Sequence, residues 1–216
     1  AGTIQMLTIG ERLGSYRVVR AIGSGGMGMV LEGVHERIKS RAAIKLLHTQ
    51  YSQLPELKER FLHEALATNI VQHPGIVSVF EHGQLPSGEA YIVMEYLDGE
   101  SLRARIERRR RGERSNSEGL DRPTMLRLMR QLASAMAAAH EKQIIHRDLK
   151  PENIMVVKDP FAMGGERVKV LDFGIAKVRG LDRGNIQTGG LLGTPAYMAP
   201  ESWAGAATVD EKVDVY

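Results

Sequence analysis

The segment YRVVRAIGSGGMGMVLEGVHERIKSRAAIKLL, Tyr16–Leu47, decides how the first part of the chain folds. Its apolar, β-branched runs are short and are separated by glycine-rich or polar turns, which is typical of antiparallel strands. The glycines fit a G-x-G-x-x-G pattern at Gly23, Gly25 and Gly28. Because strand-like residues continue after them, the pattern indicates a strand, a loop and a second strand. A dinucleotide fold would instead continue into a helix.

The glycine loop has two interpretations. Glycines let a backbone approach a polyphosphate closely and offer its N–H groups, but an ordinary hairpin turn also uses glycine. No Gly-Lys-Ser/Thr ending is present, which excludes the other common phosphate loop. Lys45, at the end of RAAIK, shares a strand face with Ala43 and could neutralise nucleotide phosphates. It needs an acidic partner, for which Glu64 is the best candidate.

The rest of the first half reads as one helix and two strands. Apolar residues in LPELKERFLHEALATNIV recur every three or four positions, which predicts an amphipathic helix with its glutamates off the apolar face or at its edge. The apolar set is Leu54, Leu57, Phe61, Ala65 and Leu66, and the glutamates are Glu56, Glu59 and Glu64. Residues 75–84 and 89–97 are predicted strands, joined by a turn at Pro86–Gly88.

The character of the chain changes near Tyr96–Gly99, after which the periodicity is helical. Residues 101–109 and 123–143 are predicted helices, and Asp121 followed by Pro123 suits a helix start. Seven arginines lie between Arg103 and Arg114. They could bind nucleic acid, anionic lipid or an acidic partner, but no aromatic residues are interleaved for base stacking. We therefore interpret the arginine run as a solvated insert between two helices, with residues 108–122 as a loop, and expect no nucleic acid.

Composition restricts the class of protein. The 216 residues are 43% hydrophobic and 25% charged, with a net charge of +3 and no cysteine. No apolar run is long enough for a membrane helix, and no signal segment is present at the start. These features predict a cytoplasmic domain without disulfides, although an anchor outside these residues stays open. Both ends look cut, so we expect a fragment of a longer protein.

The stretch HRDLKPEN, 146–153, carries chemistry. Asp148 could accept a proton from a hydroxyl, Lys150 could offset charge on a group in transfer, and Asn153 could ligate a metal through its amide oxygen. In VKVLDFG, Asp172 ends an apolar strand with a carboxylate of the kind that binds Mg²⁺, and Gly174 permits a sharp turn after it. Each residue has a bland explanation alone, but their joint occurrence in this order does not.

These motifs resemble the signature set of eukaryotic-type protein kinases. The sequence supplies GSGGMGMV, AAIK, HRDLKPEN, DFG, GTPAYMAPE and a terminal DVY that resembles the start of the family's buried central helix. The lysine of DLKPEN is similar to the serine/threonine branch, and GGMG resembles bacterial Hanks-type members. The resemblance covers Tyr16 to the last residue. It implies an α+β fold with a small antiparallel-sheet lobe and one main helix at 16–96, and a mainly helical, incomplete lobe at 97–216, after a flank at 1–15.

The resemblance also implies a role for each site residue. Lys45 would contact ATP phosphates and pair with Glu64, Asp148 would be the catalytic base with Lys150 beside the transferred group, and Asn153 and Asp172 would hold Mg²⁺, or Mn²⁺ in its place. Val30 and Ala43 resemble the residues that cover the adenine ring, Met94 occupies the gatekeeper position, and Glu95 to Leu97 resemble the hinge that bonds adenine. The residues implied in ATP binding are Ile22, Gly23, Ser24, Gly25, Gly26, Gly28, Val30, Ala43, Lys45, Met94, Glu95 and Leu97.

Regulation is implied as well. Arg147 resembles the arginine that binds a phosphorylated activation loop, and Thr188 is the expected phosphorylation site, modified by a second copy of the kinase. Thr194 resembles the threonine that contacts Asp148 and helps seat a protein substrate, although a simple turn threonine stays an alternative. We expect Ser/Thr protein substrates and signalling by phosphorylation.

Two other functions and one expectation about stability stay open. A nucleotide-binding pseudokinase would lack one of the charged site residues, and a small-molecule phosphotransferase would lack the GTPAYMAPE segment. The resemblance also implies further helices after Tyr216, including a partner for Glu201 and a helix beginning near Asp214. Without them we expect the 216 residues to be poorly stable, which a cooperative unfolding transition would contradict.

Overall fold

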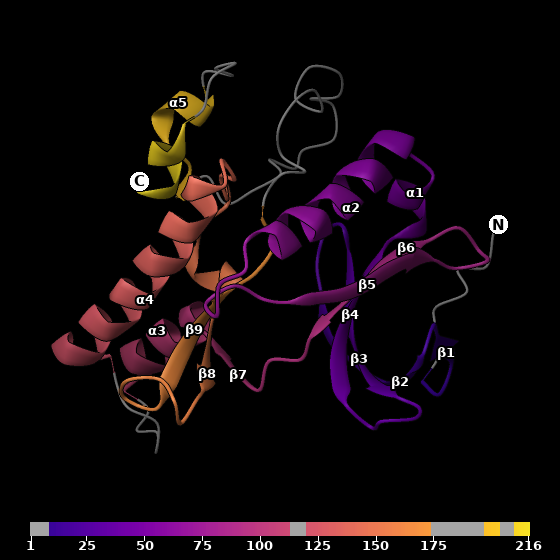
Figure 1. Cartoon of the computed structure of the whole chain (residues 1–216), viewed down its shortest axis with the longest axis horizontal. Helices are drawn as coiled ribbons and strands as arrows, with labels where there is room; N and C mark the ends of the chain where they lie inside the picture. Colours follow the sequence, from indigo (N-terminus) through magenta and orange to yellow (C-terminus); the bar gives the residue numbers. More distant parts are fainter. Residues whose placement is uncertain (1–8, 113–119, 174–196, 204–209) are drawn as a thin grey trace. The chain divides into compact units, whose positions relative to one another are not determined.

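The computed structural model describes residues 9–112, 120–173, 197–203 and 210–216 (Figure 1). Contacts divide the chain into two compact units, Ala1–Leu66 with Ser78–Leu97, and Ala67–Val77 with Asp98–Tyr216. Each unit is described by itself below. Among the described residues no helix is both long and apolar enough to cross a membrane.

The first unit is built on one antiparallel sheet of six strands in the order β1-β2-β3-β4-β6-β5. The strands are β1 Arg12–Leu13, β2 Tyr16–Ser24, β3 Gly28–His35, β4 Arg41–Leu47, β5 Val79–Gln84 and β6 Ala90–Glu95. The antiparallel strands predicted from the sequence are confirmed, including the strand on each side of the glycine loop. Within the predicted flank, β1 pairs with β2 and Leu13 is fully buried.

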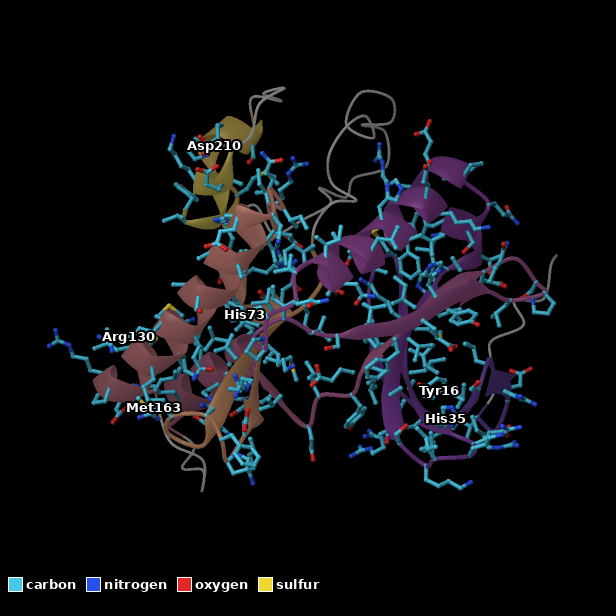
Figure 2. All side chains as sticks on the ribbon, viewed as in Figure 1. Tyr16, His35, His73, Arg130, Met163 and Asp210 are labelled. Atoms are coloured by element: carbon cyan, nitrogen blue, oxygen red, sulfur yellow. The ribbon has the colours of Figure 1, made fainter. Side chains whose placement is uncertain are left out.

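Side-chain alternation gives this sheet two different faces. Leu31, Ile44 and Val93 are opposite one another across β3, β4 and β6 and are buried in an apolar cluster. At the rim of this cluster Tyr16 meets the edge of the His35 ring, with ring centroids 5.1 Å apart (Figure 2). Residues one position along each strand point to the other face. That face carries most of the predicted site residues of this unit.

Helix α2, Pro55–Ile70, follows the one-turn helix α1, Thr49–Ser52 (Figure 1). The predicted amphipathic face is confirmed at Leu57, Phe61 and Ala65, which are all buried. The prediction is wrong for Leu54 and Leu66, each 48% exposed.

Glu64 corrects the sequence interpretation in a second way. It was expected off the apolar face of α2 or at its edge, but it is only 9% exposed. Its burial has a physical reason, since Lys45 lies within ion-pair distance of its carboxylate.

The second unit combines a three-stranded sheet with helices. Its elements are β7 Gly99–Ser101, α3 Leu102–Arg110, α4 Arg122–Glu141, the 3-10 helix η1 Pro151–Asn153, β8 Ile154–Lys158, β9 Glu166–Val170, α5 Pro200–Trp203 and the 3-10 helix η4 Glu211–Asp214. The predicted start of α4 is confirmed. Asp121 is its N-cap, and its side chain accepts a hydrogen bond from the Thr124 backbone N–H at 2.9 Å.

Helix α4 packs on β9 in this unit (Figure 1). Leu128, Ala135 and Ala139 on its inner face are each at most 1% exposed and join one apolar cluster with the strands. The Gln131 side chain adds two polar contacts, because its amide accepts from the Val168 N–H at 2.9 Å and donates to the Glu166 carbonyl at 3.0 Å. The helix and the hairpin β8–β9 therefore form one packed platform.

The arginine-rich run is not wholly a solvated loop. Arg108–Arg110 belong to α3. Arg105 is 3% exposed and makes two parallel hydrogen bonds to Glu166, at 2.7 and 3.0 Å, and a third to Glu100 at 2.9 Å. The solvated-surface interpretation is thus wrong for this part of the run, since two carboxylates offset the cost of burying the guanidinium.

The division into units differs from the predicted boundary in one segment. Residues 67–77 group with the second unit although they precede β5. Ile76 forms a parallel bridge with Val170, the Val77 N–H donates to the Val170 carbonyl at 3.1 Å, and Val170 donates in turn to Gly75 at 2.8 Å. These backbone bonds tie the segment after α2 to β9.

Candidate active site

Three residues of the HRDLKPEN stretch are brought together in the second unit. The Asp148 Oδ2 lies 3.1 Å from the Lys150 ammonium and accepts a hydrogen bond from Asn153 Nδ2 at 3.2 Å. The same Asn153 nitrogen donates to the Asp148 carbonyl at 2.9 Å. Lys150 and Asp148 are mostly buried, with side chains 17% and 19% exposed. The predicted base, cation and amide are therefore a single cluster.

His146 holds this loop from inside. It is fully buried, and its ring lies 4.9 Å from the Phe173 ring, centroid to centroid. Nε2 donates to the Leu171 carbonyl at 2.8 Å, while Nδ1 accepts from the Asp148 N–H at 3.2 Å. Burial lowers the pKa of this imidazole, so the ring is neutral with its proton on Nε2. The histidine is thus a structural bridge between Asp148 and the strand end that precedes Asp172.

Asp214 is a second anchor of the loop. Its carboxylate, 1% exposed, accepts from the backbone N–H groups of His146 and Arg147 at 2.8 and 2.7 Å, and His140 Nε2 lies 2.8 Å from Oδ2. Asp214 is the last residue of the 3-10 helix η4. Sequence reasoning missed this role because the partners lie 67 and 68 residues apart along the chain.

Two of the predicted site residues have backbone φ angles that are rare outside glycine. Arg147 has φ +64° and Asp172 has φ +44°. A left-handed residue with a Cβ costs roughly 1–2 kcal/mol, and such residues gather at functional sites where the surroundings hold them. At Arg147 the holding contact is the hydrogen bond from its N–H to Asp214.

The two predicted metal ligands come from neighbouring positions. The Leu171 N–H donates to the Asn153 carbonyl at 2.9 Å, which continues the pairing of Ile154 with Val170. Asn153 and Asp172 thus flank the same pair of strand ends. Since the Asn153 amide nitrogen is used by Asp148, its oxygen is the atom left to ligate a cation. Among the described residues no group of three or more His, Cys, Asp or Glu could hold a metal.

A set of one amide oxygen and one carboxylate fits Mg²⁺ better than a metal that prefers imidazole or thiolate. Mg²⁺ is commonly bound through one or two carboxylates together with substrate phosphates, so a sparse protein set is in keeping with it.

The charged pair predicted in the first unit is present. Lys45 Nζ lies 3.1 Å from Glu64 Oε1, with side chains 20% and 12% exposed. The ammonium also lies 5.8 Å from the centroid of the Phe61 ring. Lys45 projects from β4 and Glu64 from α2, so the pair links the sheet to its helix. A lysine in so little water is a strong electrostatic partner for anions.

The glycines of the loop differ in the space that a side chain would find at each position. A Cβ on Gly28 would lie 2.1 Å from the Leu46 carbonyl oxygen, so this glycine is required for β3 to pack against β4. A Cβ on Gly23, Gly25 or Gly26 would meet nothing within 4 Å. The open space over these three is what a loop that receives a ligand needs. The loop is closed by a hydrogen bond from the Gly25 N–H to the Gly28 carbonyl at 2.8 Å.

The predicted adenine-covering residues share one face of the sheet. Val30 is opposite Lys45 across β3 and β4, and Ala43 is opposite Met94 across β4 and β6. Met94 is buried, and Glu95 ends β6. Because directly opposed residues point to the same side, Val30, Ala43 and Met94 line a continuous strip with the lysine. Ile22 and Ser24 lie on β2, and Leu97 follows β6.

Several predictions lie outside the described residues. Gly174, Thr188 and Thr194 all fall there, and with them the predicted phosphorylation site and the substrate-seating threonine. Glu201, in α5, is described and exposed.

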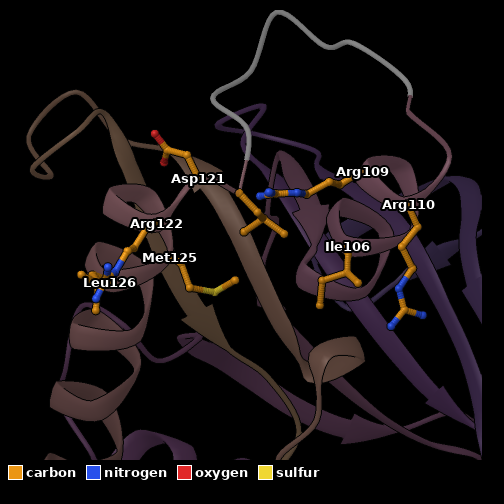
Figure 3. Close-up of a pocket in the computed structure, with 8 residues that line it drawn as sticks. Ile106, Arg109, Arg110, Asp121, Arg122, Met125 and Leu126 are labelled. Atoms are coloured by element: carbon orange, nitrogen blue, oxygen red, sulfur yellow. The ribbon is translucent and has the colours of Figure 1, made fainter.

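A hollow of about 710 Å³ opens in the second unit between the end of α3 and the start of α4 (Figure 3). It has an apolar floor and a rim of three arginines, and its lining residues are Ile106, Arg109, Arg110, Leu120, Asp121, Arg122, Met125 and Leu126. None of the predicted catalytic, ATP-binding or metal residues lines it. This hollow therefore does not mark the predicted catalytic site.

The chain is similar to known proteins along most of its length. The family model described as the protein kinase domain matches residues 16–216. The chain is 41% identical to serine/threonine-protein kinase Pkn1 of Myxococcus xanthus, over 96% of this chain and 28% of that protein. It is 40% identical to PknA of Mycobacterium tuberculosis, over 89% of this chain and 42% of that protein. The chain thus spans well under half the length of these relatives.

Solved structures agree in fold. The kinase domain of Mycobacterium tuberculosis PknI, in a double mutant, superposes with a TM-score of 0.70 at 26% identity, covering 97% of this chain and 72% of that one. The PknI kinase domain itself gives a TM-score of 0.68 at 28% identity. The chain therefore has the fold of a protein kinase domain. Because the family model matches residues 16–216, the chain belongs to the protein kinase domain family.

Proposed function

We propose that this domain is a serine/threonine protein kinase that moves the γ-phosphoryl group of ATP to a protein hydroxyl. The observation that carries the proposal is the Asp148 cluster, in which Lys150 and Asn153 both contact Oδ2. A carboxylate fixed in this way can orient a serine or threonine hydroxyl and accept its proton. The relatives at about 40% identity carry serine/threonine kinase names.

In this reaction the substrate oxygen forms a bond to the γ-phosphorus while the bond from that phosphorus to the ADP oxygen breaks. The hydroxyl proton passes to the Asp148 carboxylate, and the electron pair of the broken bond stays on ADP. Because little covalent chemistry is left to the protein, positioning and charge neutralisation supply most of the rate. Lys150 would offset charge on the group in transfer, and Lys45, held by Glu64, would do so for the other phosphates.

Family membership implies use of ATP with a divalent cation. We assign Asn153 and Asp172 as the ligands of Mg²⁺, with Mn²⁺ as a substitute. The cation would neutralise phosphate charge when bound. A second copy of the kinase would phosphorylate Thr188, and the Arg147 side chain would bind the phosphate. The substrates would be cytoplasmic proteins with serine or threonine.

Two other functions make different predictions. A pseudokinase would bind ATP without transfer, and the intact Lys45–Glu64 pair and Asp148 cluster argue against it. A small-molecule phosphotransferase would label a simple alcohol more readily than a protein.

The test is autophosphorylation of the full-length protein with Mg²⁺ and ATP beside Asp148→Asn, with phosphosites mapped by mass spectrometry. Loss of the base should lower the rate by roughly 10²–10⁴-fold. Phosphate on Thr188 in the parent and none in the variant supports the proposal. Bound ATP without any transfer, to itself or to a basic test protein, contradicts it and favours the pseudokinase.

A further inference from the structure

A carboxylate buried in the first unit has no part in the chemistry described so far. Glu32 lies in the middle of β3 and is 5% exposed. Its two oxygens are shared between two arginines, since Arg20 Nε donates to Oε2 at 2.8 Å and Arg41 Nε to Oε1 at 2.7 Å. The hydrogen bond from Arg41 holds the pKa of this carboxyl below its usual range, against the opposing effect of burial. Glu32 is therefore charged and fixed at neutral pH.

Both arginines converge on one aromatic residue. The Arg41 guanidinium carbon lies 3.7 Å from the centroid of the Tyr96 ring. Arg20 Nη2 donates to the Tyr96 hydroxyl at 3.3 Å. One arginine thus covers the ring face while the other fixes the hydroxyl at its end. A planar guanidinium on an aromatic face is a specific, directional contact.

The strand register explains why these four residues meet. Arg20 is directly opposite Glu32 across β2 and β3, and Glu32 is opposite Ala43 in β4. The pairing of Ala42 with Glu95 places the next residues, Arg41 and Tyr96, opposite each other at the end of β6. By alternation all four share the face of the sheet that carries Val30, Ala43 and Met94. The network is a continuation of the proposed adenine strip.

We propose that Glu32 is a positioning residue for ATP binding, which acts through Arg20 and Arg41 to fix Tyr96 and hence the backbone of Glu95 and Leu97 on either side. This inference rests on the proposed function, because it takes residues 95–97 as the segment that bonds the edge of adenine. An immobilised Tyr96 removes backbone freedom that ATP binding would otherwise have to restrict. In this role Glu32 acts through the two arginines and not by its own contact with nucleotide or substrate.

The central test is Glu32→Gln, which keeps the shape of the side chain and removes its charge. We expect the Kd for ATP, measured by calorimetry, and the KM for ATP to rise together by roughly three- to tenfold, with kcat changed by less than about twofold, because a pre-organised binding contact is lost equally in ground and transition states. The Kd for inorganic tripolyphosphate, which has no adenine, should stay the same. A general loss of packing would weaken the binding of both ATP and tripolyphosphate.

The matched control is Glu36→Gln. Glu36 lies in the same unit and is also shared by two arginines, with Arg17 at 2.6 Å and Arg12 at 3.5 Å, but neither contacts Tyr96. It should leave the Kd for ATP unchanged. Arg41→Lys keeps a cation for Glu32 but removes the planar group over Tyr96, and it should reproduce most of the effect of Glu32→Gln. Thermal unfolding of each variant shows that assays are made on folded protein.

The outcomes separate the two proposals. If the parent phosphorylates protein and Glu32→Gln binds ATP as Glu36→Gln does, the positioning role is wrong while the kinase function stands. If Glu32→Gln weakens the binding of ATP and of tripolyphosphate equally, the effect is a loss of structure and the positioning role is again wrong. A parent that binds no ATP at all overturns both.

Discussion

Asp214 Oδ1 accepts a hydrogen bond from the backbone N–H of Arg147 at 2.7 Å, at a residue whose φ is +64°. Its other oxygen takes the His146 N–H at 2.8 Å. One buried carboxylate thus supports the strained turn that delivers Asp148. The strain is local, but the group that holds it lies at the far end of the described chain.

We predict that Asp214→Asn destabilises the fold by about 2–4 kcal/mol, because an amide nitrogen would face a backbone N–H in place of a charged acceptor. Urea denaturation measures the change. Asp210→Asn is the control, since that side chain is half exposed and bonds only within η4. Equal unfolding free energies for the two variants would show that the anchor contributes little.

The glycine loop gives a matched pair. Gly28→Ala should destabilise the protein by several kcal/mol, roughly the size of an overpacking defect, because its Cβ would collide with the Leu46 carbonyl. Gly26→Ala meets nothing within 4 Å and should fold normally, but it should weaken ATP binding. Differential scanning fluorimetry and ATP titration separate the two effects. A Gly28→Ala protein as stable as the parent would show that β3 and β4 adjust easily.

The Lys45–Glu64 pair should behave as a unit in catalysis. Lys45→Met and Glu64→Gln should each lower kcat/KM by about 10²-fold or more, and the double variant should be little worse than either, since the glutamate acts through the lysine. Rates with a basic test protein measure this. Additive losses would mean that the two side chains act independently.

Stability should depend on pH through His146. Burial places the pKa of its folded state below the unfolded value of about 6.5, so the unfolded chain takes up the proton first. The contribution of neutral, buried His146 to the unfolding free energy is fully present above about pH 6.5 and is lost as the pH falls below that value. The unfolding free energy between pH 7 and pH 5 should fall less steeply in His146→Asn than in the parent.

Nitrogen-detected NMR of the imidazoles gives a second check that needs no substitution. It should show a larger neutral fraction for His146 at pH 6.5 than for an unperturbed imidazole, with the proton on Nε2. A mostly charged His146 at pH 6.5 would refute the assignment.

Removing Arg105 should be costly. Glu166 is mostly buried and would lose its guanidinium partner, while Glu100 would keep Arg108, so Arg105→Ala should reduce the unfolding free energy by about 3–5 kcal/mol. Arg109→Ala, at the exposed end of α3, should change it by less than about 0.5 kcal/mol. Denaturant titrations compare the two. If both variants lose similarly little unfolding free energy, the whole arginine run behaves as the solvated surface that its composition predicts.

Local patterns in the sequence were enough for several parts of the fold. Alternating apolar residues around the glycines predicted the antiparallel strands β2, β3 and β4, and Asp121 with Pro123 predicted the start of α4. The partners Lys45 and Glu64 were predicted together because the kinase-like motifs fix their order, and Asp148, Lys150 and Asn153 because they lie within six residues. These features depend on contacts within an element or on a motif spacing that the sequence itself displays.

The tertiary structure decided the rest, because it depends on residues that are distant in the chain. Composition could not distinguish the buried Arg105 from its exposed neighbours, since only the β8–β9 hairpin brings Glu166 to it. No local pattern links Asp214 to Arg147, so its role as an anchor of the loop could not be predicted from the sequence. No pattern in the sequence singles out Glu32, because only the register of four strands places two arginines and Tyr96 around it. A buried charge takes its meaning from its partners, and those are set by folding.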